Sequence, residues 1–310
     1  MPYECSQIGL HESIDAIFSV EALREELADI DPEVTVIGDD REAIAACDAV
    51  VTRFYLDAYA EEVEWLHAIQ SGVDRFPLDE LEEAGVVLTN SAGIHGTAVG
   101  EMVTGYLLAL AHGIHDHVRN AQDGEWDRPA WNDAFTLPGH SLCVVGLGTL
   151  GQGIAERAAK LGMDVTGVKR TVEPVEYVDE VYPASDLVPA VSEADFVALA
   201  VPLTDETRHL VGAAELDAMR DDAYLVNVAR GPVVDEAALV DALREGRLAG
   251  AALDVFEEEP LPEDSPLWDL ENAILTPHCA SITQDYPVDV AALVRENLGR
   301  DPDEFTNRVV

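Results

Sequence analysis

Three glycines in the segment VVGLGTLGQG have the spacing of a turn that holds phosphate groups. Gly146, Gly148 and Gly151 form the pattern G-x-G-x-x-G between the apolar stretch SLCVV and the helical stretch QGIAERAAKLG. Glycines at these positions permit a tight turn and a close backbone approach to a pyrophosphate, and the following helix supplies N–H donors. The pattern alone is weak, but its strand–turn–helix context favours a dinucleotide site over an incidental turn.

Two basic residues end the strand that is expected after that helix, in GMDVTGVKRT. Many NAD-binding proteins have an acidic residue there, which binds the ribose 2′-hydroxyl. This chain instead has Lys169, Arg170 and Thr171, and its one other lysine is Lys160. A carboxylate would repel a 2′-phosphate, whereas a cation and a hydroxyl bind it. The sequence therefore predicts NADP as the cofactor, with NAD as the alternative if the two basic residues are merely solvated.

Three polar residues lie shortly after apolar stretches farther along the chain. Arg230 follows AYLVNVA, Glu259 follows GAALDVF, and His278 follows NAILTP. Each alone has an ordinary explanation: a surface arginine, a solvated glutamate in an acidic run, a capping histidine. Ligands of open parallel sheets bind outside the carboxyl ends of the strands, so we expect the three side chains to converge on one crevice.

Two regions of alternating strands and helices have to position these residues. In the first region, short apolar stretches predict a parallel sheet with crossover helices, with strands at residues 6–10, 33–38, 48–54 and 86–89. In the second region, continuously apolar stretches predict strands that are covered on both faces, at residues 141–146, 164–168, 195–201, 223–229, 250–256 and 272–277. Helical spacing is expected over residues 13–30 and 236–246.

The segment between the two regions has a different character. Residues 97–121, TAVGEMVTGYLLALAHGIHDHVRNA, predict one long helix that connects two domains. Residues 121–140 have no periodicity and are rich in Trp, Pro and Gly. They form either an arm that covers a partner subunit or a packed surface loop.

The composition limits the class of protein. A length of 310 residues suggests about two domains. The chain has 61 Asp+Glu against 18 Lys+Arg, a formal net charge of −43, spread along its whole length. Such a halophilic composition is typical of proteins in salt-loaded cells, because about 1 M salt shortens the Debye length to about 3 Å. The charge argues against nucleic acid as a partner.

Targeting and metal signals are also missing from the sequence. No apolar stretch is long enough to span a membrane, and the first residues, MPYECSQIGLHESID, do not resemble a signal peptide. A cytoplasmic location without a membrane partner is therefore expected. The cysteines lack metal-ligand spacing, so we expect free thiols and no metal site; they are Cys5, Cys47, Cys143 and Cys279.

Taken in order, these motifs resemble the D-isomer-specific 2-hydroxyacid dehydrogenases over nearly the whole chain. The resemblance rests on QSGVD, GLGTLGQG, VPLTDETRHLVG, LVNVARGPVVDE, LDVFEEEP and PLWDLENAILTPH. It implies an α/β fold of two doubly wound parallel-sheet domains, flavodoxin-like for the substrate and Rossmann-like for the dinucleotide, with a cleft between them and usually a homodimer. The substrate domain is expected at 1–95 plus 283–310. The dinucleotide domain, with the linking helix and a dimer arm at 121–140, is expected at 96–282.

The resemblance also assigns roles to individual residues. Arg230 would bind the carboxylate of a 2-keto acid, His278 would exchange a proton with the carbonyl oxygen, and Glu259 would hold the imidazole. The backbone N–H groups of Gly72 and Val73 would bind the substrate carboxylate. The implied cofactor-binding residues are Gly146, Gly148, Thr149, Leu150, Gly151, Lys169, Arg170, Thr171, Val201, Thr207, Ala229 and Asp254, the last at the nicotinamide carboxamide.

The predicted activity is reversible reduction of a 2-keto acid to a D-2-hydroxy acid by hydride transfer from NADPH. Glyoxylate or hydroxypyruvate reduction is the alternative within the class. Phosphoglycerate dehydrogenase is less expected because no regulatory domain follows His278, and formate dehydrogenase because its relatives have Gln where Glu259 stands. A nucleotide-sensing, corepressor-like module is the alternative from another class. The identity of the keto acid is not encoded in any motif.

Overall fold

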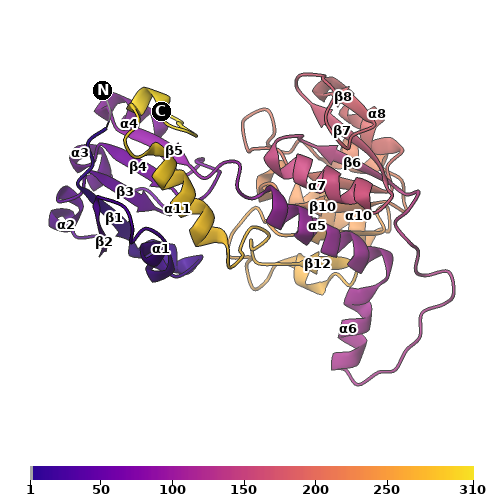
Figure 1. The fold of residues 1–310 in the computed structure, drawn as a ribbon. Helices are drawn as coiled ribbons and strands as arrows, with labels where there is room; N and C mark the ends of the chain where they lie inside the picture. Colours follow the sequence, from indigo (N-terminus) through magenta and orange to yellow (C-terminus); the bar gives the residue numbers. More distant parts are fainter. Residues whose placement is uncertain (1–2) are drawn as a thin grey trace. The chain divides into compact units, whose positions relative to one another are not determined.

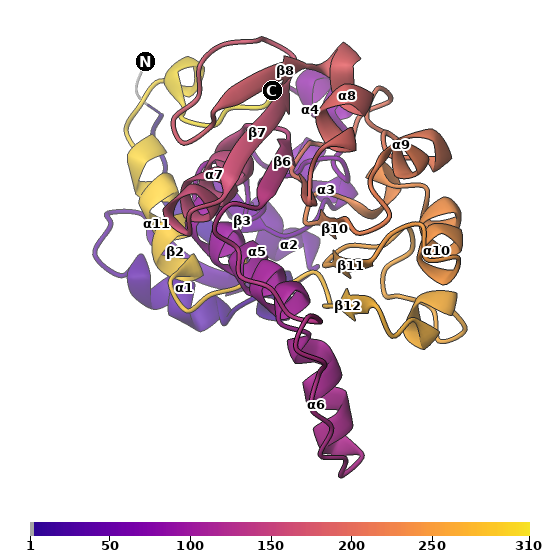
Figure 2. The same cartoon turned by 90° about the vertical axis from the view of Figure 1, so that its right-hand side faces the viewer.

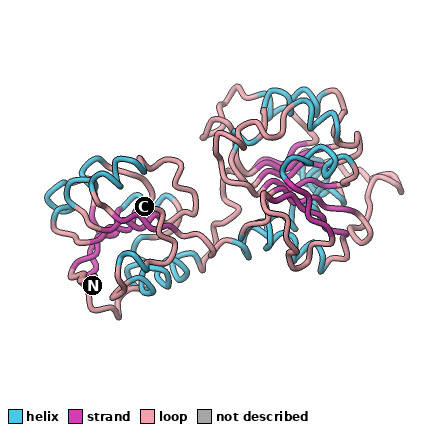
Figure 3. The backbone as a smooth tube through the Cα atoms, turned by 90° about the horizontal axis from the view of Figure 1, so that it is seen from above, coloured by secondary structure: helices cyan, strands magenta, loops and turns pink. Residues whose placement is uncertain are grey.

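The computed structural model describes residues 3–310, which divide into two compact units (Figure 1). Unit 1 comprises the chain up to Ile94 together with Ile282–Val310, and unit 2 comprises His95–Ser281. In each unit the strands form one layer with helices on both faces (Figure 3). The predicted fold class, two doubly wound parallel-sheet domains, is confirmed.

The sheet of unit 1 has five parallel strands in the order β2-β1-β3-β4-β5. This is the flavodoxin-like order: the strands are all parallel, and the direction in which successive strands are added reverses beside the first strand. The strands are β1 (Gln7–His11), β2 (Glu33–Ile37), β3 (Ala49–Thr52), β4 (Trp65–Ala68) and β5 (Val87–Asn90). The helices are α1 (Val20–Glu26), α2 (Arg41–Ala45), α3 (Asp57–Glu62), α4 (Leu78–Ala84) and α11 (Tyr286–Asn297).

Two apolar clusters, one on each face, hold this sheet between its helices. The first contains Ile8 and Leu10 of β1 together with α1 and with Val290 and Val294 of α11. The second contains Val50 of β3 with residues of α2, α3 and α4. The C-terminal helix thus completes the core of the unit that the N-terminal residues begin (Figure 1).

One local expectation for unit 1 is wrong, and one strand of this unit was not predicted. The helical stretch 13–30 is divided into a 3-10 helix, Glu12–Ala16, and α1, because Ser19 adopts an extended conformation and caps α1 with its side chain.

Strand β4 was not predicted, because His67 interrupts its apolar character. His67 is nevertheless 1% exposed. It forms hydrogen bonds with the hydroxyls of Thr89 (2.9 Å) and Ser91 (3.1 Å), and burial lowers its pKa to about 3.

The sheet of unit 2 has seven parallel strands in the order β12-β11-β10-β9-β6-β7-β8. The order reverses at β6 and β9, which is where open α/β sheets bind ligands. The strands are β6 (Ser141–Val145), β7 (Asp164–Lys169), β8 (Glu180–Pro183), β9 (Phe196–Leu199), β10 (Tyr224–Asn227), β11 (Gly250–Leu253) and β12 (Ala273–Leu275). Strand β8 was not predicted; it is a partly exposed edge strand without an apolar run.

The helices of unit 2 cover both faces of this sheet. Leu142 and Val144 of β6 pack toward α5 (Gly96–Ala111) and α7 (Thr149–Lys160), and Cys143 and Val145 pack toward the opposite helices. This alternation buries every residue of the strand after Ser141, as expected for a sheet covered on both sides. The opposite helices are α8 (Leu187–Ser192), α9 (Ala213–Ala218) and α10 (Glu236–Arg244).

The prediction of one long connecting helix is wrong. The segment forms two helices, α5 and α6 (Ile114–Gln122), which are separated by Gly113 at φ 61°. This left-handed conformation is readily adopted only by glycine and ends the first helix. Helix α6 then projects away from the sheet of unit 2 (Figure 2). The loop after it, starting at Asp123, is exposed as far as Ala134; Phe135 is then partly buried against the core, and Leu137 is buried in it.

None of the helices within residues 3–310 combines the length and the apolar character needed to cross a bilayer. All four cysteines are free thiols, of which Cys47 and Cys143 are buried. Burial raises the pKa of the Cys143 thiol to about 11. This thiol therefore stays protonated and serves as a small apolar core residue.

Candidate active site

The glycine turn follows β6, where strand order reverses. Gly146 has φ 98°, and a Cβ at this position would lie 2.7 Å from the carbonyl oxygen of Ala200. A Cβ on Gly151 would lie 1.8 Å from the carbonyl oxygen of Gly146. Both positions therefore require glycine, the first for conformation and close packing and the second for packing alone.

Gly148 differs from the other two glycines, because a Cβ there would meet no atom within 4 Å. Open space beside the turn is the room that a pyrophosphate needs. Helix α7 begins at the next residue, Thr149, and no side chain caps its N-terminal N–H groups. These donors and the positive end of the helix dipole suit a doubly charged phosphate chain. The residues present therefore fit the dinucleotide that the fold implies.

Helix α5 packs backbone to backbone against α7, a contact that was not predicted. A Cβ on Gly153 would lie 2.0 Å from the carbonyl oxygen of Gly96, and a Cβ on Gly100 would lie 2.5 Å from the carbonyl oxygen of Gly153. Gly96 and Gly100 are four positions apart and so share one face of the helix, a pattern from which a close contact with another helix could have been predicted. This contact fixes the helix that begins at the phosphate turn.

The basic residues expected at the 2′-phosphate lie at the carboxyl end of β7, next to β6. Lys169 is the last residue of the strand, and Arg170 and Thr171 follow it on an exposed turn. The Nζ atom of Lys169 donates to Glu173 at 2.5 Å. The Lys169 ammonium lowers the pKa of Glu173 through this hydrogen bond, so the carboxylate is ionised at neutral pH. The sequence analysis did not identify Glu173 as a partner of the Lys169 ammonium.

His278 and Glu259 form a hydrogen-bonded pair. The Nδ1 atom of His278 lies 2.9 Å from Oε2 of Glu259. An ionised carboxylate only accepts hydrogen bonds, so Nδ1 carries the proton and Nε2 remains for another partner. The imidazole side chain is 42% exposed and the carboxylate 22%. The pair can thus hold a proton at Nε2 and deliver it to a ligand.

Arg230 follows β10, which lies beside β11 in the sheet. Its Nη1 atom donates to the carbonyl oxygen of Ala229 at 2.8 Å. A Cβ on the next residue, Gly231, would lie 1.8 Å from the carbonyl carbon of Phe256. The loop that carries Arg230 therefore lies directly against the segment that leads to Glu259. Neighbouring strands thus bring the three predicted side chains to one edge of the sheet, with a direct contact between His278 and Glu259.

The other predicted cofactor residues lie at the same edge of the sheet. Val201 follows β9, and its side chain contacts the position where a Cβ of Gly146 would lie. Thr207 closes a turn in the same loop by donating to the carbonyl oxygen of Pro202 at 2.6 Å. Ala229 is buried after β10. Leu150 lies in the first turn of α7.

Asp254 directly follows β11 and is 2% exposed. Its carboxylate accepts hydrogen bonds from Thr276 and from backbone N–H groups just after His278. The hydroxyl of Thr276 is also bonded to Tyr106 of α5. Sequence reasoning missed both hydroxyl residues. Tyr106 and Thr276 are separated by 170 positions, so no local pattern connects them.

Gly72 and Val73 belong to unit 1, in the loop that follows β4. Neighbouring side chains hold this loop: Asn90 donates to the carbonyl oxygen of Ser71 at 2.7 Å, and Gln70 donates to that of Arg53 at 2.6 Å. The Ser71 hydroxyl donates to the carbonyl oxygen of Ser91 at 3.0 Å. The loop conformation is therefore fixed by hydrogen bonds to flanking segments of unit 1.

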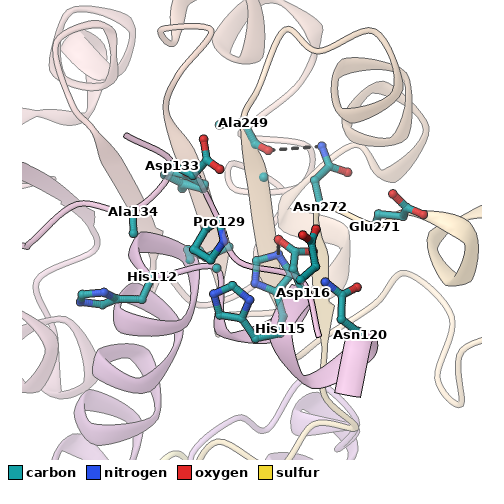
Figure 4. Close-up of a pocket in the computed structure, with 16 residues that line it drawn as sticks. His112, His115, Asp116, Asn120, Pro129, Asp133, Ala134, Ala249, Glu271 and Asn272 are labelled. Atoms are coloured by element: carbon teal, nitrogen blue, oxygen red, sulfur yellow. Dashed lines mark hydrogen bonds and ion pairs between the residues drawn. The ribbon is translucent and has the colours of Figure 1, made fainter. Parts of the chain in front are cut away.

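A cavity of about 450 Å³ in unit 2 is separate from these residues. Figure 4 shows its polar lining, which includes His112 at the end of α5 and His115 and Asp116 at the start of α6. Tyr224 and Gly250, the first residues of β10 and β11, also line it. It therefore lies at the amino edge of the parallel sheet, whereas the glycine turn and the His278 pair lie at the carboxyl edge.

Sequence and structure comparisons with known proteins agree on one family. The sequence model described as "D-isomer specific 2-hydroxyacid dehydrogenase, NAD binding domain" matches residues 104–280. A glyoxylate reductase of Thermofilum pendens is 36% identical, over 99% of this chain and 90% of the relative. A crystal structure of a D-isomer specific 2-hydroxyacid dehydrogenase from Xanthobacter autotrophicus, in complex with NADPH and MES, is 30% identical with a TM-score of 0.84. It covers 99% of this chain and 98% of that one.

A second solved structure is that of an NADPH-dependent glyoxylate/hydroxypyruvate reductase from Sinorhizobium meliloti, in complex with NADP and sulfate. It is 25% identical with a TM-score of 0.83, and the match covers 98% of both chains. The similarity extends over the whole chain and includes both units. The chain belongs to the D-isomer-specific 2-hydroxyacid dehydrogenases, a family of NAD(P)-dependent oxidoreductases.

Proposed function

We propose that this protein reduces a 2-keto acid to the D-2-hydroxy acid with NADPH as the preferred cofactor, and with NADH as a weaker one. The observation that carries the proposal is the His278–Glu259 hydrogen bond of 2.9 Å at the carboxyl edge of the dinucleotide sheet. When bound, the nicotinamide supplies the hydride. The chain's own residues bind the acid, orient it and move one proton.

The roles of the side chains follow from their chemistry. The planar guanidinium of Arg230 suits a carboxylate and polarises the neighbouring carbonyl. His278 Nε2 donates the proton that the carbonyl oxygen needs as it becomes an alkoxide, and it accepts that proton in the reverse direction. Glu259 keeps the proton on Nδ1 and orients the imidazole. Gly72 and Val73 are proposed to contribute backbone N–H donors to the substrate carboxylate, and Asp254 an acceptor for the carboxamide.

The preference for NADPH rests on Lys169, Arg170 and Thr171. Several related structures contain NADPH or NADP, whereas others contain NAD. A cation pair and a hydroxyl are the groups that bind a phosphate monoester. Because Glu173 holds Lys169, we propose that Lys169 exchanges this partner for the 2′-phosphate.

Small 2-keto acids, glyoxylate and hydroxypyruvate, are the proposed substrates, because several relatives carry these names. A steady-state screen in concentrated KCl, crossing NADPH and NADH with glyoxylate, hydroxypyruvate, pyruvate and a bulky 2-keto acid, tests the proposal. We expect turnover within the ordinary enzyme range of about 1–10³ per second, with higher kcat/KM for NADPH and the small acids. Binding of NADPH without turnover of any acid would instead indicate a nucleotide-sensing module.

We further propose that the protein works in the cytoplasm of a salt-loaded cell. The net charge of −43 would produce strong self-repulsion in dilute buffer. Concentrated salt screens this repulsion, and exposed carboxylates keep the protein hydrated. The screen therefore includes a dilute-buffer series, in which we expect lower activity.

The arm after α6 is the proposed contact with a second copy of the chain. Trp126 and Trp131 are 90% and 95% exposed, and Ile114 and Val118 of α6 are 45% and 52% exposed. Ile114 and Val118 are four positions apart and so share one face of the helix. Exposed apolar groups of this size are typical of protein interfaces.

Replacing both Trp126 and Trp131 by serine is expected to convert a homodimer to a monomer, because large aromatic side chains dominate interface energies. Sedimentation velocity in concentrated KCl measures the change. Trp268→Ser is the matched control, since Trp268 is 56% exposed but lies outside the arm. A double variant that remains dimeric, or a wild-type protein that sediments as a monomer, contradicts the assignment of the arm.

A further inference from the structure

Three successive backbone N–H groups bind one residue, Asp254. The N–H of His278 donates to the backbone carbonyl oxygen of Asp254 at 2.8 Å. The N–H of Cys279 donates to Oδ1 of its carboxylate at 3.0 Å, and the N–H of Ala280 donates to Oδ2 at 2.9 Å. The turn that carries the proposed proton donor is therefore wrapped around a single buried side chain.

This turn needs an external anchor. His278 has φ 51°, a left-handed conformation that a residue with a Cβ seldom adopts. Such a backbone persists only where its surroundings determine it, and it is typical of active sites. The Asp254 carboxylate supplies the two hydrogen bonds that hold the residues after the turn. The position of Asp254 thus decides where the imidazole lies.

The Asp254 carboxylate is itself held by a chain of two hydroxyls. The Thr276 hydroxyl donates to Oδ1 of Asp254 at 2.6 Å. A hydroxyl has a single proton to donate, so the Tyr106 hydroxyl, 2.5 Å from that of Thr276, is the donor in the other bond. Tyr106 is 4% exposed, and burial raises the pKa of its phenol, which keeps the donor proton in place.

Tyr106 belongs to α5, the helix that packs backbone to backbone on α7 at Gly96, Gly100 and Gly153. The same helix therefore supports the phosphate turn at one place and the His278 turn at another. A rigid support of this kind is what places a proton donor correctly against an oriented substrate.

We infer that Tyr106 and Thr276 are positioning residues of the reaction: their hydroxyls fix Asp254 and, through it, the left-handed turn that presents His278. The inference rests on the proposed role of His278 in proton transfer. Neither hydroxyl contacts the imidazole. They act on the rate of the chemical step and leave binding of the acid to other groups.

The test compares Thr276→Val, Thr276→Ser and Tyr106→Phe with the wild-type enzyme. Valine keeps the shape of threonine and removes the donor, so we expect kcat for keto-acid reduction to fall about 10–100-fold, the size of effect that a misplacement of about 1 Å produces. KM for the acid should change less than about threefold. Thr276→Ser retains the hydroxyl and should restore kcat to within about threefold of the wild-type value. Tyr106→Phe should lower kcat by about 3–10-fold.

Tyr3→Phe is the matched control, because its hydroxyl also donates to a partner, the carbonyl oxygen of Asp48 at 2.7 Å, in the other unit. It should lower the melting temperature without changing kcat. If Thr276→Val and Tyr106→Phe only lower the melting temperature, as the control does, the inference is wrong. It is equally wrong if they weaken NADPH binding more than tenfold while kcat is retained, since Asp254 would then act through the cofactor.

The His278→Ala variant separates the positioning role from the proposed function. Wild-type turnover that is abolished in His278→Ala, with Thr276→Val at the wild-type rate, removes the positioning role and leaves the proposed function intact. Turnover that survives in His278→Ala removes the proposed function first. A double variant, Tyr106→Phe with Thr276→Val, should be no slower than Thr276→Val alone, because both changes break one chain of hydrogen bonds.

Discussion

Replacement of His278 by alanine is expected to lower kcat for keto-acid reduction by about 10²–10⁴-fold, the usual contribution of a general acid. The carbonyl oxygen then has to take its proton from water. The dissociation constant of NADPH should change less than about threefold, because the phosphate turn after β6 and the basic residues at the end of β7 belong to other strands than the one that His278 follows. Stopped-flow turnover and fluorescence titration of NADPH measure the two quantities separately.

Two further variants make this expectation specific. Glu259→Gln keeps a hydrogen-bonding group beside Nδ1 but removes the negative charge, so it should retain more activity than His278→Ala and less than the wild-type enzyme. His112→Ala removes an exposed histidine that lines the cavity at the amino edge of the sheet and should leave the rate unchanged. Near-normal turnover of His278→Ala would show that another group donates the proton.

The parts of the site that the sequence predicted are those whose signals are local. The left-handed φ of Gly146 and the clash of a Gly151 Cβ with the carbonyl oxygen of Gly146 both arise within six residues of chain, and the preceding strand and following helix are equally local. The close approach of Gly146 to Ala200 is not local, and no motif predicts it. Arg230, Glu259 and His278 each stand just after an apolar strand. Because all strands of the sheet are parallel, strand ends that are distant in sequence meet at one edge.

The parts that the sequence did not predict depend on contacts between distant segments or on single conformations. Strand β4 contains His67, whose burial is possible only because Thr89 and Ser91 of a neighbouring segment satisfy both ring nitrogens. The break between α5 and α6 depends on the left-handed conformation of Gly113. A single glycine inside a helical pattern does not by itself predict whether that residue will adopt this conformation. The Tyr106–Thr276 bond joins residues with no shared pattern.

We expect the charge at the end of β7 to determine the cofactor preference, so that changing this charge should reverse the preference. Exchanging Lys169 for Asp together with Arg170 for Ala is expected to lower the kcat/KM ratio of NADPH to NADH by about 10²-fold or more. Two charge-assisted hydrogen bonds to a phosphate contribute about 1.5–3 kcal/mol each, and about 1.4 kcal/mol corresponds to a factor of ten. The introduced carboxylate would repel the 2′-phosphate and accept from the ribose hydroxyl of NADH.

Glu173 provides the opposite change at the same place. Its carboxylate holds the Lys169 ammonium at 2.5 Å, so we expect it to compete with the 2′-phosphate for that cation. Glu173→Gln should therefore tighten NADPH by about two- to fivefold, the range expected for one exposed ion pair, and leave NADH nearly unaffected. The effect should shrink as KCl increases, because exposed charges are screened. Isothermal titration of both cofactors across a salt series measures it. Equal shifts for NADPH and NADH in both variants would remove the 2′-phosphate from this site, since only NADPH carries that group.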